Sequence, residues 1–471
     1  MTRLQLAGPS YALRNRSADV QRCINWIPVQ IESGAGKGGS QSYLKQVPGK
    51  AVLATAAGAW RGLWVAGGVL YGVAGSSLYS IDADFALTAL ATSIHGTDPV
   101  GMADNNTQLA ITNGSALYVV ELSTGAVSTL GDGEGFLGST RVDVIDGYGV
   151  FGTPDGRTLF TTGQQDFTSI NPLDFGSAES STGNIVAHIV KHREVLVLKD
   201  RTGEIWFDAG NPDGIPLSPN TGATIEAGCV APHSLQKIAG MAMWLGRDDR
   251  GAGIVFGMQA YIPARISTHA LEEALAGLTE AQIAAASAYT YHQEGLSFYV
   301  LNVPGLSTTW VYEVAAGIWH ERAEFMNGEY LPDYGRCHAY AYGTHVVGGA
   351  DGNLYSLDQS LNTSGTRHLV RERITPHNAD PGNNRVRFGS LQVDGQVGAG
   401  LDGSDAKIML RYSDDGGNMW TGWRQLSLGK IGEYRARART TMLGAGRDRV
   451  WNIRVTDDVK FEPSAIVIDE R

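Results

Sequence analysis

Five arginines near the C-terminal end form the densest group of residues that could do chemistry. Arg435, Arg437 and Arg439 alternate with other residues, and Arg447 and Arg449 follow. Because alternate residues of a strand project from one face, the first three are expected to share a face. Guanidinium groups bind carboxylates and phosphates, often in bidentate pairs. Three interpretations stay open: a solvated sheet face, a subunit interface that pairs arginine with carboxylates, and contact with DNA phosphates.

A second candidate is the segment Ser413–Trp420, which reads SDDGGNMW. It matches the Asp-box pattern S-x-D-x-G-x-x-W of sialidase propellers through Ser413, Asp415, Gly417 and Trp420. In that pattern the Asp side chain binds backbone within a hairpin turn and the Trp packs beneath it. A single copy predicts a structural turn rather than a catalytic site.

Two further motifs lack what their chemistry requires. Gly34–Ser40 resembles a phosphate loop, but Ile31 and Gly38 stand where that motif needs Gly and Ser or Thr, so a flexible connector is expected. His188 and His192 lie four apart in a segment with the pattern of a strand, where they would stand ~13 Å from each other and would not share a metal ion. We therefore predict no catalytic residue, no cofactor, no metal site and no enzymatic activity.

The composition favours a multidomain all-β chain. Among 471 residues, 61 are Gly, 43% are hydrophobic and 18% are charged, so apolar residues are interspersed with turn formers. The net charge of -11 argues against a surface that grips nucleic acid, although weak repulsion would let DNA slide through a conduit. Three cysteines without metal-ligand spacing indicate a reducing compartment, and neither a secretory signal nor a membrane span is expected.

A repeated hairpin organises the first three quarters of the chain. Gly68–Asp82, Gln108–Leu122 and His345–Asp358 each contain an apolar run, a Gly-containing turn and a second run with Leu-Tyr. Looser copies lie between them, and successive copies start 39 to 55 residues apart. Propeller blades of four strands take ~40 to 50 residues each, so the spacing predicts a β-propeller of six or seven blades.

The predicted fold is an all-β propeller with a small helical insertion and a C-terminal β-sandwich. Residues 1–50 are expected to form an N-terminal arm and propeller-closing segment, residues 51–360 the propeller, and residues 361–471 the sandwich, where strands such as Lys407–Tyr412 alternate cleanly. The Ala- and Leu-rich stretch 268–288 predicts the helices, with a capping box from Thr279 to Gln282. It has no Lys or Arg, which favours packing or subunit contact over DNA reading.

Several short motifs occur in an order that resembles a known family. They are Asn15–Pro28, Tyr43–Gly49, Trp60–Gly62, Arg193–Leu198 with Gly203–Phe207, the helices after Pro263–Ser267, and Arg411–Gly417 followed by Leu443–Arg447. In this order the chain resembles the packaged-DNA stabilisation or tail hub (nozzle) proteins of short-tailed, podovirus-type phages. The resemblance extends over nearly the whole chain.

That resemblance implies a structural protein of the virion tail, assembled in the host bacterial cytoplasm. It implies a homo-oligomer, a hexameric ring below the portal or head-to-tail adaptor protein, that helps close the DNA channel after packaging. It also implies docking of tail spike, fibre or needle proteins and non-specific passage of genomic DNA, with no cofactor and no membrane.

Two alternatives stay open. The Asp-box match and Trp-containing loops such as those of Trp310 and Trp319 would also fit a propeller glycosidase or a carbohydrate-binding tail protein. A cellular propeller scaffold is the other alternative.

Overall fold

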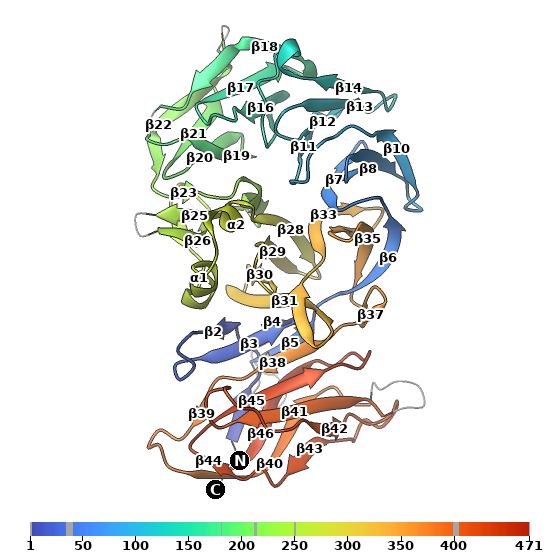
Figure 1. Ribbon diagram of the computed structural model, residues 1–471, viewed down its shortest axis with the longest axis vertical. Coiled ribbons are helices and arrows are strands. Elements are labelled where there is room, and N and C mark those ends of the chain that lie inside the picture. The colour runs from blue at the N-terminus through green and yellow to red at the C-terminus, as the bar shows by residue number, and fades with distance from the viewer. Residues whose placement is uncertain are drawn as a thin grey trace.

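The computed structural model describes residues 2–33, 41–179, 181–211, 214–248, 251–398 and 405–470. It has two bodies, a disc of radiating sheets and a smaller β-sandwich, with both chain termini at the sandwich end (Figure 1). The predicted all-β fold, with a propeller, a small helical insertion and a sandwich, is confirmed. Gly34–Ser40, the expected connector, lies outside the described residues.

Within the described residues the propeller has seven blades, which decides between the six and seven expected. The first two blades consist of β7 (Trp60–Ala66), β8 (Val69–Ala74), β9 (Ser77–Ile81) and β10 (Leu87–Ala91), and of β11 (Gly101–Asp104), β12 (Gln108–Thr112), β13 (Leu117–Glu121) and β14 (Val127–Leu130). The next two consist of β15 (Asp143–Ile145), β16 (Tyr148–Gly152), β17 (Thr158–Gly163) and β18 (Asp166–Ser177), and of β19 (Ile185–Lys191), β20 (Glu194–Lys199), β21 (Gly203–Asp208) and β22 (Leu217–Ile225).

The last three blades include added strands. The fifth consists of β23 (Gly228–Cys229), β24 (Gln236–Ile238), β25 (Met241–Asp248), β26 (Gly251–Met258) and β27 (Pro263–Arg265). The sixth consists of β28 (Ser287–Gln293), β29 (Leu296–Asn302), β30 (Thr309–Glu313), β31 (Ile318–Met326) and β32 (Glu329–Pro332). The seventh consists of β33 (Gly335–Ala341), β34 (Thr344–Gly349), β35 (Asn353–Asp358) and β6 (Gly49–Thr55), with the short strands β36 (Thr363–Ser364) and β37 (Arg367–His368) beside β6.

The repeated hairpins seen in the sequence are the middle strand pairs of the blades. Tight turns join neighbouring strands, as between β7 and β8, where Gly67 and Gly68 have φ of 55° and 80°. Two successive positive φ angles suit a two-residue hairpin turn, because that turn matches the twist of the strands. Aromatic rings fill the space between blades: Phe136 and Phe151 meet edge to face with centroids 5.3 Å apart.

Strand β6 closes the propeller ring. It pairs antiparallel with β35, from Gly49 opposite Asp358 to Thr55 opposite Asn353, so the seventh blade takes its outer strand from the start of the chain. The expected boundary at residue 50 therefore falls inside a strand. Residues 363–368, expected in the sandwich, pair instead beside β6, because Ser364 lies in parallel register with Lys50.

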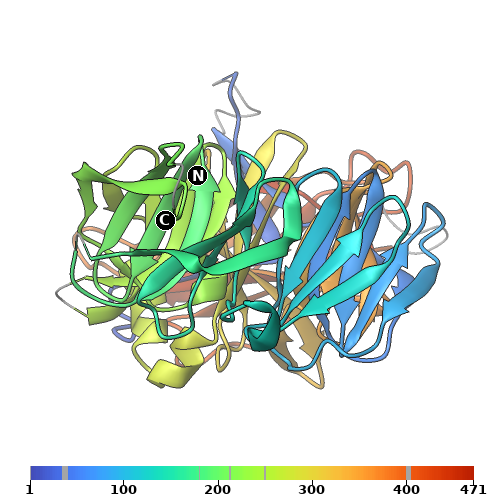
Figure 2. The same ribbon diagram turned by 90° about the horizontal axis from the view of Figure 1, so that it is seen from above.

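Two short helices lie between the fifth and sixth blades. They are α1 (His269–Leu275) and α2 (Glu280–Ala284), and they lie on one face of the disc, whereas the strand ends of β4 (Trp26–Gln30) and β5 (Ser42–Gln46) project from the opposite face (Figure 2). The capping box is confirmed, since Thr279 accepts from the backbone N–H of Gln282 and the Gln282 side chain accepts from that of Thr279. Leu271, Leu275 and Ile283 are buried in the blade core, so the helices pack rather than extend into solvent.

The sandwich has two sheets. One contains β1 (Thr2–Gln5), β46 (Pro463–Glu470), β40 (Val386–Gly395), β43 (Ala438–Thr441) and β44 (Ala445–Gly446). The other contains β38 (Arg371–Ile374), β45 (Asp448–Val455), β41 (Lys407–Ser413), β42 (Arg424–Ser427) and β39 (Asn378–Ala379), and it is joined by β3 (Val20–Ile24) with β2 (Tyr11–Ala12). The first strand of the chain is thus a sandwich strand, paired with the last one.

Candidate functional site

A single continuous sheet joins the propeller to the sandwich. At one edge of blade six, Ile24 of β3 lies in parallel register with Glu321 of β31. On its other side β3 pairs antiparallel with β38, which pairs in turn with β45 of the sandwich. We call the residues of β3, β31, β38 and β45 with their polar partners the joint. The joint is the candidate functional site, because its buried charges lie where distant segments meet.

An ion pair binds β3 to blade six. The Arg22 guanidinium donates to both carboxylate oxygens of Glu321, at 3.1 Å from Nε and 2.5 Å from Nη2, and Thr308 donates a further bond of 2.7 Å. Burial alone would raise the pKa of Glu321, but the charge and hydrogen bonds of Arg22 offset it and hold that pKa below its usual value. Both groups are therefore charged at neutral pH.

Glu372 on β38 collects donors from both domains. Arg454 of β45 binds its Oε2 through Nε at 3.0 Å and Nη2 at 2.6 Å, and Asn452 donates to its Oε1 at 2.6 Å. The hydroxyl of Tyr330, from β32 of the propeller, donates to the same carboxylate. Because Glu372 and Arg454 form a buried ion pair, removing one of these two charges leaves the other uncompensated.

Asn25 ties the turn after β3 to both neighbouring segments. Its Nδ2 donates to the carbonyl oxygens of Ala323 at 2.7 Å and Val370 at 2.8 Å, and its Oδ1 accepts from the Ala323 N–H at 3.0 Å. Its φ of 56° is in the left-handed region, which Asn tolerates better than most residues. One side chain thus links blade six to the strand that enters the sandwich.

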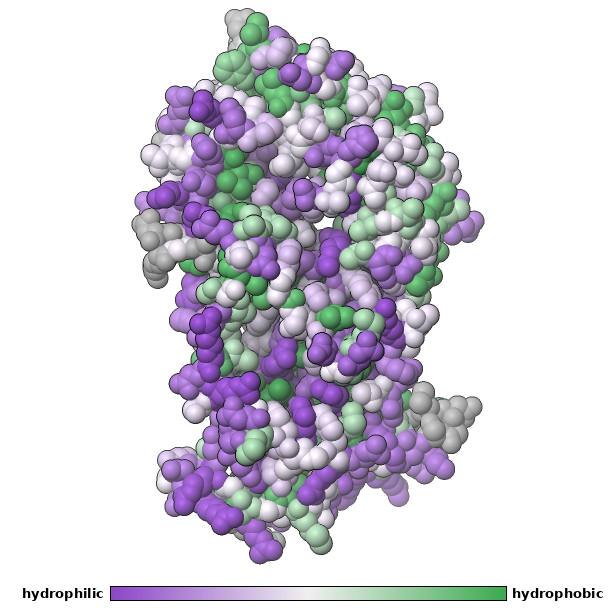
Figure 3. Space-filling model, in the orientation of Figure 1, coloured by the Kyte–Doolittle hydropathy of each residue, from purple (hydrophilic) through white to green (hydrophobic). Residues whose placement is uncertain are grey.

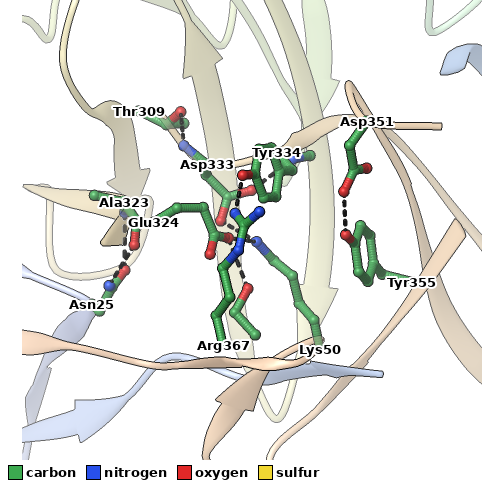
Figure 4. A network of polar contacts seen from close by, with 12 residues as sticks. Asn25, Lys50, Thr309, Ala323, Glu324, Asp333, Tyr334, Asp351, Tyr355 and Arg367 are labelled. Carbon is green, nitrogen blue, oxygen red and sulfur yellow. Dashed lines mark hydrogen bonds and ion pairs between the residues drawn. The ribbon is translucent and has the colours of Figure 1, made fainter. Parts of the chain in front are cut away.

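A buried lysine in β6, the strand that closes the propeller, forms a second cluster of ion pairs next to the joint (Figure 4). Lys50 of β6 donates to Glu324 at 2.9 Å and also to Asp333, and all three are buried. Ser364 donates to Glu324 at 2.7 Å. Burial would raise the pKa of Asp333, but the nearby Lys50 charge lowers it. Strand β6 is therefore held by these ion pairs as well as by its backbone pairing with β35.

These residues have a mechanical role in the arrangement. The carboxylates of Glu321, Glu324 and Glu372 are occupied by Arg, Lys, Asn, Ser, Thr or Tyr donors, which leaves them saturated rather than poised to transfer a proton. Among the described residues no three His, Cys, Asp or Glu side chains come together as metal ligands. The joint can fix the orientation of the two domains and resist their separation.

Sequence reasoning missed the joint. The signal was charged residues inside runs that otherwise have the pattern of buried strands, as in Ile318–Met326, which reads IWHERAEFM, and Arg371–Ile374, which reads RERI. Charges at such positions are rare unless they are paired. Their partners lie up to 299 residues away, as for Arg22 and Glu321, so spacing alone could not pair them.

The C-terminal arginines do not share one strand face, which corrects the expectation. Strand β43 begins at Ala438, so only Arg439 is in it, and Arg435 and Arg437 lie in the turn before it. These three and Arg447 are exposed. Arg449 is not available to a partner, because it is 1% exposed and donates to Asp414 at 2.6 and 2.7 Å.

Ser413–Trp420 forms a turn held by its own side chains. Asp415 accepts from the backbone N–H groups of Asn418 at 3.0 Å and Met419 at 2.9 Å, and Ser413 accepts from that of Gly417 at 2.8 Å. Gly417 has φ of 82°, and a Cβ there would lie 3.2 Å from the Trp420 ring. The geometry is that of a structural turn.

The two tryptophans that suggested carbohydrate binding lie in strands β30 and β31 rather than in loops, and both are buried. Trp310 and Trp319 are 7% and 1% exposed and pack in the hydrophobic cluster that also holds the helices, so neither offers a face for stacking on a sugar. His188 is buried and contacts the Val150 carbonyl oxygen at 3.0 Å, whereas His192 lies in the following turn with φ of 51°. Cys23, Cys229 and Cys337 are free thiols. None of the described helices is long and apolar enough to cross a bilayer.

The chain is similar to solved propellers at low sequence identity. BamB from Moraxella catarrhalis is 11% identical, with a TM-score of 0.37 over 70% of this chain and 100% of BamB. The Cps50 (Swd1) propeller domain from Myceliophteria thermophila is 9% identical, with a TM-score of 0.40 over 64% and 98%. PorZ from Porphyromonas gingivalis is 15% identical, with a TM-score of 0.39 over 80% and 46%. No curated protein matches the chain.

Family models match both domains. Residues 21–362 match the family described as bacteriophage P22 Gp10, beta-propeller, and residues 371–469 match bacteriophage P22 Gp10, beta-sandwich. The first match alone covers more than half of the chain, and the two occur in the order of the two bodies seen here. The chain therefore belongs to the bacteriophage P22 Gp10 family and is a structural protein of the phage tail.

Proposed function

We propose that this protein is the tail hub or nozzle, a hexameric ring below the portal or head-to-tail adaptor protein. The observation that carries the proposal is the match of one chain to both the propeller and the sandwich of the same phage family. In this role the ring helps to close the DNA channel after packaging and docks tail spike, fibre or needle proteins. Assembly takes place in the host bacterial cytoplasm, without a membrane.

The joint supports a role in which each subunit must stay rigid under force. A ring that confines packaged DNA must keep each subunit rigid, because a closed symmetric assembly repeats any hinge motion at every interface. Here the sheet runs without a break from blade six to the sandwich, and Arg22, Glu321 and Glu372 are paired inside it. The work of the protein is then done by interfaces rather than by a chemical site.

The tip of the sandwich is the proposed contact surface for a neighbouring subunit. Exposed Arg435 and Arg437 lie beside Tyr434, which is 73% exposed. Arginine and aromatic residues are enriched in protein interfaces, whereas a DNA-binding surface would need a wider basic stripe. Arg439 follows in β43, whereas Arg447 is exposed near the start of β40, where it donates to the Asn383 carbonyl oxygen, and is not part of this surface.

Electron microscopy of the protein purified with its portal and adaptor partners tests this proposal. Ring particles are expected for the wild type, and fewer rings for the double variant Arg435→Glu, Arg437→Glu. The double variant Arg157→Glu, Arg201→Glu reverses two charges in propeller turns, where the side chains are 79% and 74% exposed, and this matched control should leave ring formation unchanged. If only monomers appear with every partner present, the hub assignment fails.

A further inference from the structure

A cavity of about 320 Å³ lies at the axis of the propeller, enclosed by the inner strands of the blades. Its walls come from β7, β11, β24, β28 and β33, which surround the centre of the disc (Figure 1), and from residues 141–142 ahead of β15. Hydrophilic side chains gather at the centre of this face (Figure 3). The cavity is separate from the joint and from the C-terminal arginines.

The charges that line this cavity are all positive. Arg61, Arg141, Lys237 and Arg336 line it, and no Asp or Glu is among its described lining residues. This contrasts with the net charge of -11 for the whole chain. A cluster of like charges inside a low-dielectric wall attracts counter-ions, because the field is focused in the cavity.

The guanidinium groups are held in place by backbone rather than by carboxylates. Arg61 donates to four carbonyl oxygens, including those of Asp98 at 2.7 Å and Ile94 at 2.8 Å. Arg141 donates to the carbonyl oxygens of Pro232 at 2.9 Å and His188 at 3.2 Å. Neither forms an ion pair with a carboxylate of the described residues. Lys237 is paired with Asp143 at 3.5 Å, so the positive charge that remains in the cavity is carried by the guanidinium groups.

Two of the arginines that line the cavity, Arg141 and Arg336, have N–H groups that are not used in hydrogen bonds within the described residues. Among the described residues, Nη2 of Arg141 and Nη2 of Arg336 have no hydrogen-bond partner, since Arg336 donates only through Nη1, to Asn302 at 3.0 Å and to two carbonyl oxygens. The imidazole of His233, which also lines the cavity, has no partner there either. Burial first, and then the charges of Arg141 and Arg61, lower the pKa of His233 to about 3, so the ring is neutral and can hydrogen-bond an anion.

We propose that the axial cavity is a binding site for a small tetrahedral oxyanion of the phosphate class, held by Arg61, Arg141, Arg336 and Lys237. Guanidinium groups suit such an oxyanion because their N–H groups form short charge-assisted hydrogen bonds with it. The cavity volume matches an ion or a small phosphomonoester and is far too small for duplex DNA. The bound anion would neutralise the charge that the blades bring together at the axis.

Isothermal titration of the full chain with inorganic phosphate at low ionic strength tests the site. Saturable binding of one phosphate per chain is expected. Lys237→Gln and Arg336→Gln should each weaken binding by about tenfold, because each removes a charge-assisted contact. The Lys237 side chain is 48% exposed, so its replacement leaves the fold intact even if Arg336→Gln does not.

Arg157→Gln removes one exposed positive charge from the turn between β16 and β17 and is the matched control, with an expected change below twofold. Titration with AMP separates two sources of the same chemistry. If AMP competes with inorganic phosphate, the site binds phosphate esters as well as the free ion. If AMP does not compete, the site binds the free ion alone. The proposal is overturned if wild-type protein shows no saturable phosphate binding, or if Lys237→Gln and a folded Arg336→Gln bind phosphate as tightly as the wild type.

Discussion

At the scale of single residues, buried charge in this protein is placed where segments far apart in the sequence meet. Lys50 lies 274 residues from Glu324 and 283 from Asp333, and all three are buried in one cluster. A buried ion pair is a weak source of net stability, because desolvation opposes the Coulomb attraction. It is nevertheless costly to break, so such a cluster penalises every arrangement in which the ring is open.

Lys50→Met should lower the free energy of unfolding by about 3 to 5 kcal/mol, because Glu324 and Asp333 would remain buried without their cation. Urea unfolding followed by tryptophan fluorescence measures the change. Lys430→Met replaces an exposed lysine with the same residue and should cost less than about 0.5 kcal/mol. Equal stability of the two variants would show that the Lys50 cluster does not hold the ring.

His320 gives a pH dependence with a defined sign. It is fully buried, neither ring nitrogen has a partner among the described residues, and burial followed by the Arg322 charge lowers its pKa well below 6.5. The unfolded chain therefore binds the proton first as the pH falls, so stability present above pH 6.5 is lost on acidification toward the folded pKa.

His320→Leu should remove this loss. Between pH 7.5 and pH 5 the variant should lose about 2 kcal/mol less unfolding free energy than the wild type, since each pH unit below 6.5 is worth about 1.36 kcal/mol per group. Denaturant unfolding at both pH values is the measurement. His269→Leu changes an exposed histidine and should leave the wild-type pH dependence in place. A wild-type slope in His320→Leu would contradict the assignment.

At the scale of elements, two N-terminal strands decide how the rest of the chain is assembled. β6 completes blade seven, and β3 joins blade six to the sandwich through one parallel pair and one antiparallel ladder. A single parallel residue pair is a weak ladder, so side chains must hold the register. Asn25 does so directly after β3, through three hydrogen bonds to Ala323 and Val370.

Asn25→Gly should lower the free energy of unfolding by about 2 to 4 kcal/mol, because three buried hydrogen bonds are lost while the positive φ remains allowed. Thermal and urea unfolding both report the change. Asn106→Gly is the matched control, since Asn106 is exposed and has φ of 73°. If both glycine variants are equally stable, the hydrogen bonds of Asn25 do not maintain the register.

At the scale of the whole molecule, the sandwich is not built from the C-terminal region alone. Leu6, Cys23, Trp26 and Leu44 are fully buried in its hydrophobic core, and Trp26 donates to the Phe461 carbonyl oxygen at 3.2 Å. Removing a buried Leu or Trp side chain costs about 2 to 5 kcal/mol, and a whole domain is stable by only about 5 to 15 kcal/mol. The N-terminal segment is therefore part of the folding unit of the sandwich.

A fragment of residues 371–471 should fail to unfold cooperatively and should lack near-ultraviolet circular dichroism. Joining its C-terminus through a short Gly-Ser linker to residues 2–48 should restore both signals, because Thr2 lies opposite Ile468 in adjacent antiparallel strands. The same fusion with Trp26→Ala is the control and should be weakened. Cooperative unfolding of the isolated fragment at the midpoint of the fusion would refute a shared core.

The sequence by itself determined the features that depend on neighbours along the chain. Hairpin spacing predicted the blades, clean alternation predicted β41, and the pattern from Thr279 to Gln282 predicted the capped helix, because turns, alternation and caps are set within a few residues. The tertiary structure alone decided that there are seven blades, that β6 closes them, and that β3 joins the domains. It also decided that Arg449 is buried against Asp414 while Arg435 is exposed. The physical reason is that strand pairing and the burial of charge depend on partners hundreds of residues away, which local patterns do not specify.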